Sequence, residues 1–140
     1  MSSSQARYKI GDKAEMTKIF SDADIIKYAQ ASGDSNPIHC DGDYAVITGF
    51  KGGIVHGILV AGLISAVLGT KLPGMGTIYV SQNLKFIKPV FINDSVTARV
   101  EITNIDENKK RLTLSTYCFT GDGNLVITGE AVVIPPNKLL

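Results

Sequence analysis

The segment at residues 32–39, SGDSNPIH, places an aspartate and a histidine five residues apart, on either side of a proline. Its glycine allows the chain to leave a helix with a positive φ, and Pro37 disfavours helical values at the residue before it. The segment is therefore stiff, and Asn36 is suited to hydrogen-bond the local backbone and hold the bend. Across such a bend Asp34 and His39 could face one cavity as an acid–base pair. On spacing alone, an ordinary helix exit with a surface histidine explains the same residues.

A second candidate site is His56-Gly57, at the start of an apolar segment over residues 58–69. A helix N-terminus has unpaired N–H groups, and a glycine there lets a ligand carbonyl approach the backbone closely, as in an oxyanion hole. Gly57, Ala61 and Ser65 recur every four residues and give a face with room for a flat ligand group. Close packing against a sheet or a partner helix explains these small residues equally well. His56 itself also fits the description of a hydrogen-bonded, semi-buried histidine without a catalytic role.

The elements that position these residues follow from capping and periodicity. Ser21 is a good N-cap for a helix that ends at Gly33, and a short helical turn is expected near Asp41. The segment over 58–69 is apolar on every side, which indicates a helix surrounded by protein. After residue 76 the period changes from 3.6 to 2. Strands are expected over 13–20, 77–88, 95–105, 111–120 and 125–134.

The last three strands are joined by short hairpins and are therefore expected to be antiparallel neighbours. A curved antiparallel sheet wrapped around the apolar helix would bury that helix, which predicts an α+β class. A single sheet of this kind leaves its edges and part of the helix open. A homodimer that continues the sheet is therefore expected.

Composition and charge exclude several classes of protein. The 140 residues suit one domain over 1–140, with 44% hydrophobic and 19% charged residues. The net charge is +1, and no basic cluster exceeds the one at 109–111, so a nucleic-acid partner is not expected. The longest apolar run is shorter than the ~20 residues that span a bilayer, and the polar stretch 1–11 is unlike a signal peptide. A cytoplasmic protein without a membrane partner is predicted. Cys40 and Cys118 lack metal-ligand spacing, so two reduced, buried thiols and no metal are expected.

Taken together, the motifs resemble a known family. YAQASGDSNPIH at 28–39 and GIVHGIL at 53–59 are similar to the signature of the MaoC-like (hydratase 2) family, particularly its short (R)-specific enoyl-CoA hydratases. The Gly-Asp-x-Asn-Pro-x-His core is highly specific for that family. PVFIND at 89–94 and TGEAVV at 128–133 give further support, so the resemblance extends over most of the chain.

The resemblance implies a hot-dog fold, a homodimer and reversible syn hydration of trans-2-enoyl thioesters to (R)-3-hydroxyacyl thioesters. It implies no cofactor, because the coenzyme A thioester is itself the substrate. Asn93 stands where the family often has glycine. Gly62 lies in a region where the size of the side chain affects the space for the acyl chain. The implied site consists of the catalytic dyad Asp34 and His39, the supporting Asn36, the Gly57 N–H as donor to the thioester oxygen, Ser65 near the acyl group, and Val55 and His56 as further binding residues.

Three alternatives remain at this point: a hot-dog acyl-thioester hydrolase, an acyl-carrier-protein dehydratase and a non-catalytic acyl-CoA-binding module. The two enzymes commonly place a catalytic carboxylate on the central helix, as those families are known. Residues 57–69 contain no Asp or Glu, which counts against both. A binding module would need a broken dyad, and this dyad is intact. The acyl chain length, the carrier, the pathway, the assembly beyond a dimer and the primary base of the dyad stay open.

Overall fold

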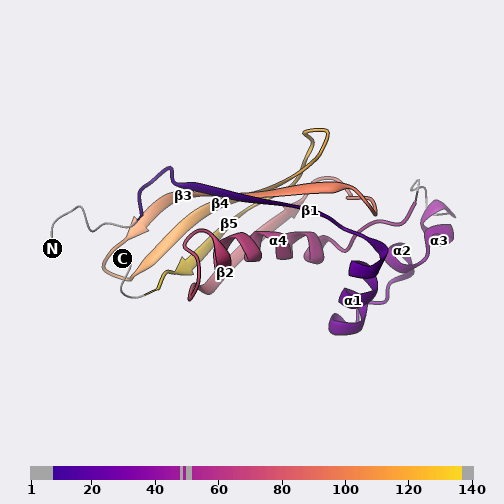
Figure 1. The fold of residues 1–140 in the computed structure, drawn as a ribbon, viewed down its shortest axis with the longest axis horizontal. Helices are drawn as coiled ribbons and strands as arrows, with labels where there is room; N and C mark the ends of the chain where they lie inside the picture. Colours follow the sequence, from indigo (N-terminus) through magenta and orange to yellow (C-terminus); the bar gives the residue numbers. More distant parts are fainter. Residues whose placement is uncertain (1–7, 48, 50–51, 137–140) are drawn as a thin grey trace.

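The computed structural model describes residues 8–47, 49 and 52–136, so residues 1–7 of the polar N-terminal stretch lie outside it. One antiparallel sheet has the strand order β1-β3-β4-β5-β2, and helix α4 lies along one of its faces (Figure 1). This is the predicted α+β layer arrangement. The strands are β1 (Lys13–Ile19), β2 (Ile78–Phe86), β3 (Ser95–Asp106), β4 (Arg111–Thr120) and β5 (Leu125–Ile134).

The centre of the sheet follows directly from period-2 alternation. In β3 every second side chain from Val96 to Ile102 is buried, and in β4 every second side chain from Leu112 to Cys118 is buried. The prediction that β3, β4 and β5 are antiparallel neighbours is confirmed by their register. The buried side chains of β3 and β4 face α4 and form a large part of the core: Val96, Ala98, Val100, Ile102, Leu112, Leu114, Thr116 and Cys118.

The edge strands pair with segments far away in the chain. β1 pairs with β3, and β2 pairs with β5 across a register shift between Tyr79 and Ser81. A Cβ on Gly129 would lie 2.0 Å from the backbone oxygen of Asn83, so only glycine permits this close approach of β5 to β2. The edge strand β2 is thereby held against β5, next to the cavities described below.

Helix α4 (Gly57–Thr70) is apolar all round but packs on one side only. Val60, Ile64 and Val67 are buried, whereas Ile58 is 57% exposed and Gly62 and Ser65 are also exposed. As expected for a single sheet, part of the helix stays open in the single chain, because one sheet covers only one side of a helix. Within the described residues, no helix is long and apolar enough to cross a membrane.

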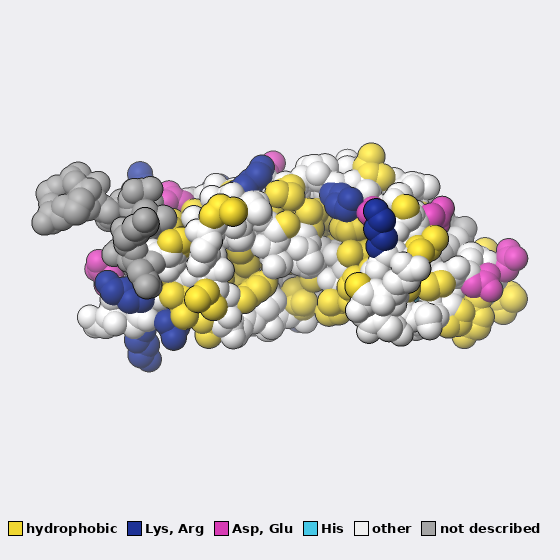
Figure 2. All heavy atoms as spheres, turned by 60° about the horizontal axis from the view of Figure 1, so that its bottom comes forward, with side chains coloured by type: hydrophobic (Ala, Val, Ile, Leu, Met, Phe, Trp, Pro, Cys, Tyr) yellow, Lys and Arg dark blue, Asp and Glu magenta, His cyan; other side chains and the backbone are white. Residues whose placement is uncertain are grey.

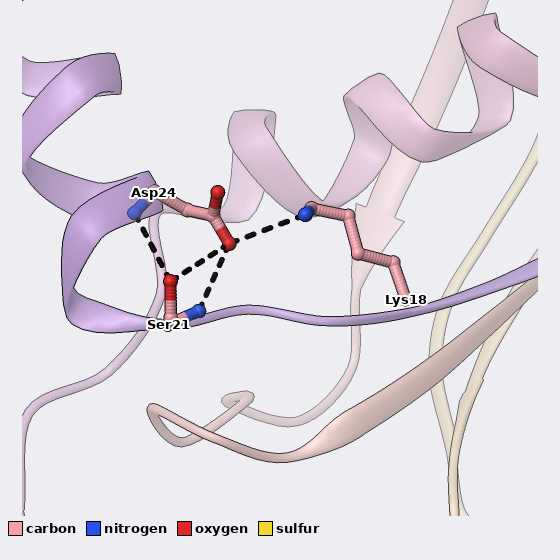
Figure 3. Close-up of polar contacts among 3 residues, drawn as sticks. All are labelled: Lys18, Ser21 and Asp24. Atoms are coloured by element: carbon pink, nitrogen blue, oxygen red, sulfur yellow. Dashed lines mark hydrogen bonds and ion pairs between the residues drawn. The ribbon is translucent and has the colours of Figure 1, made fainter.

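Three short helices, α1 (Asp22–Ser32), α2 (Pro37–Cys40) and α3 (Gly42–Ile47), lie beyond one end of the sheet (Figure 1). As predicted, Ser21 caps α1, and its side chain and that of Asp24 form a reciprocal capping box beside Lys18 (Figure 3). The N–H of Ser21 donates to the Asp24 carboxylate, and this bond is the main cause that lowers the pKa of Asp24. Gly33 ends α1 with φ of 82°, also as predicted.

Candidate active site

The segment between α1 and α2 is held by a chain of local hydrogen bonds. The N–H of Asp34 donates to the Ser32 hydroxyl at 3.0 Å, and the N–H of Asn36 donates to the Asp34 carboxylate at 3.2 Å. Asn36 is the N-cap of α2, where its side-chain oxygen accepts from the N–H of Ile38 at 3.1 Å. Asn36 therefore holds the bend as predicted.

The imidazole of His39 has one nitrogen committed to the backbone. Its Nδ1 lies 2.9 Å from the carbonyl oxygen of Ile54. A carbonyl only accepts, so Nδ1 carries the proton of the neutral ring and Nε2 keeps its lone pair. Ile54 is itself tied to Phe91 by an isolated β-bridge. The structure thus presents His39 Nε2 as a proton acceptor.

His56 packs against the dyad from the protein interior. It is 2% exposed, and its Nε2 lies 2.9 Å from the carbonyl oxygen of Asp34. Its ring stacks on that of His39 with centroids 4.1 Å apart and planes 30° apart. The ring of Tyr28 lies 4.6 Å from it at a tilt of 59°. His56 therefore contacts both members of the predicted dyad.

Asp34, His39 and His56 each offer one ligand-type atom, and these atoms lie within 4.8 Å of one another. Each imidazole already uses one nitrogen on a backbone carbonyl. One of the two remaining ring nitrogens, Nδ1 of His56, is buried. The Asp34 carboxylate is exposed and His39 is half-buried. This arrangement suits proton transfer at a water molecule better than coordination of a metal.

A cavity of about 390 Å³ opens beside His39 at the start of α4. Its walls are mostly apolar, which favours an apolar ligand group over a charged one. Gly57 lies at its edge, where a Cβ would come within 2.7 Å of the Phe86 ring. The residues that line it include His39, Ile54, Val55, Gly57, Ile58, Phe86, Lys88 and Ile127.

A second cavity of about 310 Å³ lies between α4 and β2 and shares Ile58 with the first. Ser65 and Gly62 line it from the helix. From the strand, the Tyr79 hydroxyl donates to the side-chain oxygen of Gln82 at 2.5 Å, and burial raises the pKa of Tyr79 to about 12. This cavity is thus largely apolar with a few hydroxyl and amide groups.

The family model described as MaoC like domain matches residues 4–120. The chain belongs to the MaoC-like family. The matched range includes Asp34 and His39.

Relatives of this MaoC-like chain agree in name and in structure. The (R)-specific enoyl-CoA hydratase of Rhodospirillum rubrum is 52% identical over 130 residues, which cover 93% of this chain and 90% of that protein. The (R)-specific enoyl-CoA hydratase of Aeromonas caviae is 48% identical over 128 residues, covering 91% and 96%. The solved (R)-hydratase from A. caviae superposes with a TM-score of 0.90 at 47% identity, covering 92% of this chain and 98% of that one. R-hydratase PhaJ1 from Pseudomonas aeruginosa gives 0.89 at 40% identity, covering 94% and 84%. The predicted hot-dog fold is confirmed.

The predicted site residues of the MaoC-like chain separate into groups. His39, Val55 and Gly57 line the first cavity, and Asp34 lies next to His39. Ser65 lines the second cavity, and His56 lines neither of the two. Asn36 also lines neither cavity. The sequence analysis missed Phe86 and Lys88, and their only sequence signal is their position at the end of a strand before a proline. It also expected two buried thiols, whereas Cys118 is buried and Cys40 is exposed, because α2 is too short to be covered on all sides.

Proposed function

We propose that this protein is an (R)-specific enoyl-CoA hydratase, which adds water reversibly to trans-2-enoyl-CoA to give (R)-3-hydroxyacyl-CoA. The observation that carries this proposal is the Asp34–His39 pair beside an apolar cavity that ends at the N-terminus of a helix. The names of the relatives from R. rubrum and A. caviae support the same activity. The short exposed loop that bears Asp34 gives water direct access to the pair.

The tautomer of His39 suggests how the proton moves. Water lies between the two side chains and is oriented by the Asp34 carboxylate. As the water oxygen attacks C3, His39 Nε2 takes one of its protons. The imidazolium then returns a proton to C2 from the same face, which makes the addition syn and restores the neutral ring. The electron pair of the double bond becomes the new C2–H bond, so atoms and charge balance.

The negative charge that develops during the attack lies on the thioester oxygen. The unpaired N–H of Gly57 at the start of α4 is placed to stabilise it, with the help of the helix dipole. Val55 forms an apolar wall of the cavity, and its N–H donates to the carbonyl of Val90 at 2.8 Å. Ser65 lies in the second cavity, which we assign to the acyl side of the substrate.

Addition of water to a double bond transfers no electrons to the protein, so the proposed reaction needs no redox cofactor. Coenzyme A enters only as part of the substrate. Cytoplasmic location remains a prediction from the sequence.

A homodimer is proposed from the apolar surface around the edge strand β2. Ile58 of α4 and Ile78, Val80 and Phe86 of β2 are between 47% and 59% exposed. Figure 2, which brings the side of α4 forward, shows hydrophobic side chains exposed between the charged groups. A second copy pairing along β2 would bury this surface and continue the sheet, and sedimentation of the purified protein measures the mass.

The function is tested by following the loss of the conjugated enoyl absorbance of crotonyl-CoA. Wild type is expected to be active, and Asp34→Asn and His39→Gln are each expected to lose at least about 100-fold in kcat. Asp43→Asn, an exposed carboxylate on α3, is the matched control and is expected to leave kcat unchanged. The product is assayed for the (R) configuration with a stereospecific dehydrogenase. Release of free thiol without hydration would instead identify a hydrolase.

A further inference from the structure

His56 is buried at the centre of the site without lining either cavity. Its Nε2 lies 2.9 Å from the carbonyl oxygen of Asp34, and its ring face lies against His39 at 4.1 Å. It is therefore the one side chain named above that contacts the backbone of one dyad member and the ring of the other. Substrate in the cavity beside His39 would not touch it.

The hydrogen bonds of His56 specify its tautomer. The Asp34 carbonyl only accepts, so His56 carries its proton on Nε2. Its Nδ1 is buried, and no group in the described part of the chain hydrogen-bonds to it. A proton on Nδ1 would have no acceptor there. His56 is thus the Nε2–H tautomer, the opposite of the Nδ1–H tautomer of His39.

We infer that His56 is a positioning residue that holds the Asp34–His39 pair in its reactive geometry. The Nε2–H bond fixes the backbone at Asp34, the residue after the left-handed Gly33. Within the described part of the chain, the other hydrogen bonds of Asp34 are short-range and stay in its own exposed loop. The ring face fixes the plane of His39 so that its Nε2 points away from the Ile54 carbonyl. Tyr28 packs on the His56 ring and limits its movement. The catalytic part of this inference rests on the proposed hydratase activity, whereas the tautomer assignment does not.

Two substitutions separate the two contacts. His56→Gln retains an N–H donor near the position of Nε2 and removes the ring. His56→Phe retains the ring and removes the donor. Since a misplacement of about 1 Å can cost on the order of 100-fold in rate, each variant is expected to lose about 10- to 100-fold in kcat on crotonyl-CoA, with KM within about threefold of wild type. His56→Ala, which loses both contacts, is expected to lose more than either.

A control separates positioning from general destabilisation. Ile102→Val trims a fully buried side chain in β3 beside the start of β1, at the end of the sheet opposite α1. It is expected to lower the midpoint of chemical unfolding without a change in kcat. If both His56→Gln and His56→Phe keep kcat within threefold of wild type, or if their loss lies wholly in KM, the inference is wrong.

The tautomers are tested independently of activity. The chain has two histidines, so protein labelled with ¹⁵N-histidine gives four ring nitrogens, and His56→Phe assigns them. We expect protonated Nδ1 and bare Nε2 for His39, and the reverse for His56. A His56 ring protonated at Nδ1 overturns the inference even if the kinetics agree. If wild type fails to hydrate crotonyl-CoA while the tautomers are as expected, the proposed function fails and the geometry stands.

Discussion

Substitution of Gly57 by alanine tests the start of α4 most directly. An added Cβ would lie 2.7 and 2.8 Å from two carbons of the Phe86 ring, which is 0.7 and 0.6 Å short of the 3.4 Å at which ordinary contact begins. The contacting atoms belong to a side chain that is 49% exposed in the single chain, so the ring and not the backbone has to give way. The free energy of unfolding is therefore expected to fall by only about 1–2 kcal/mol, the lower part of the range for overpacking.

Activity is expected to fall much further than stability. Gly57 and Phe86 both line the cavity beside His39, so the new methyl group and the displaced ring occupy the space of the thioester. Alanine keeps the N–H, but the added methyl group holds the thioester oxygen away from it. Loss of one oxyanion interaction typically costs 100- to 1,000-fold, so we expect kcat/KM of Gly57→Ala on crotonyl-CoA to fall about 100-fold. Adding Phe86→Leu, which shortens the ring side chain, is expected to return about 10-fold if displacement of the ring contributes.

Gly69→Ala is the matched control on the same helix, since no heavy atom lies within 4 Å of its added Cβ. It is expected to raise the free energy of unfolding by about 0.5–1 kcal/mol through helix propensity and to leave kcat/KM unchanged. Initial rates and denaturant unfolding curves measure both quantities. If Gly57→Ala keeps kcat/KM within threefold of wild type, the close approach of substrate to this N–H is refuted.

Three further predictions concern stability and thiol chemistry. The pKa of Asp24 is lowered in the fold, so its contribution to stability is complete above its unfolded pKa of about 3.9 and is lost as pH falls through the lower folded value. Asp24→Asn should therefore lower the free energy of unfolding in urea by about 0.5–1 kcal/mol at pH 7 and by less at pH 3. At pH 7 the effect should exceed that of the control Asp22→Asn. Gly129→Ala should unfold at markedly lower denaturant or fail to fold, because its Cβ would meet a β2 backbone oxygen at 2.0 Å; wild-type stability would contradict the pairing of β5 with β2. Burial raises the pKa of Cys118 to about 12, so a thiol reagent at pH 8 should modify only the exposed Cys40 in native protein and both thiols in denaturant; two fast thiols in the native state would contradict the core packing.

Much of the fold was predictable because it depends on neighbours in the chain. Period-2 alternation in β3 and β4 follows from the pleat, and the hairpins between them leave one possible pairing. The capping box at Ser21 and the left-handed Gly33 are likewise properties of a few adjacent residues. The same local logic predicted that Asn36 closes the bend, where its side-chain oxygen accepts from the N–H of Ile38.

The partners of the edge strands were not predictable in this way. β1 joins β3, and β2 joins β5, across long stretches of sequence. Such pairing depends on the packing of the whole sheet on α4 and not on any local period. For the same reason the apolar helix could not show which of its sides stays exposed in the single chain.

By itself, the sequence determined that Asp34 and His39 flank a rigid bend and that a glycine opens the apolar helix, since both depend on local backbone chemistry. Only the tertiary structure decided the tautomers. Ile54 is 15 residues from His39, and His56 is 22 residues from Asp34, yet both contacts are 2.9 Å long. A ring nitrogen is a donor or an acceptor according to the group it meets in space. The chemistry of this pair is therefore set by contacts that no spacing in the sequence encodes.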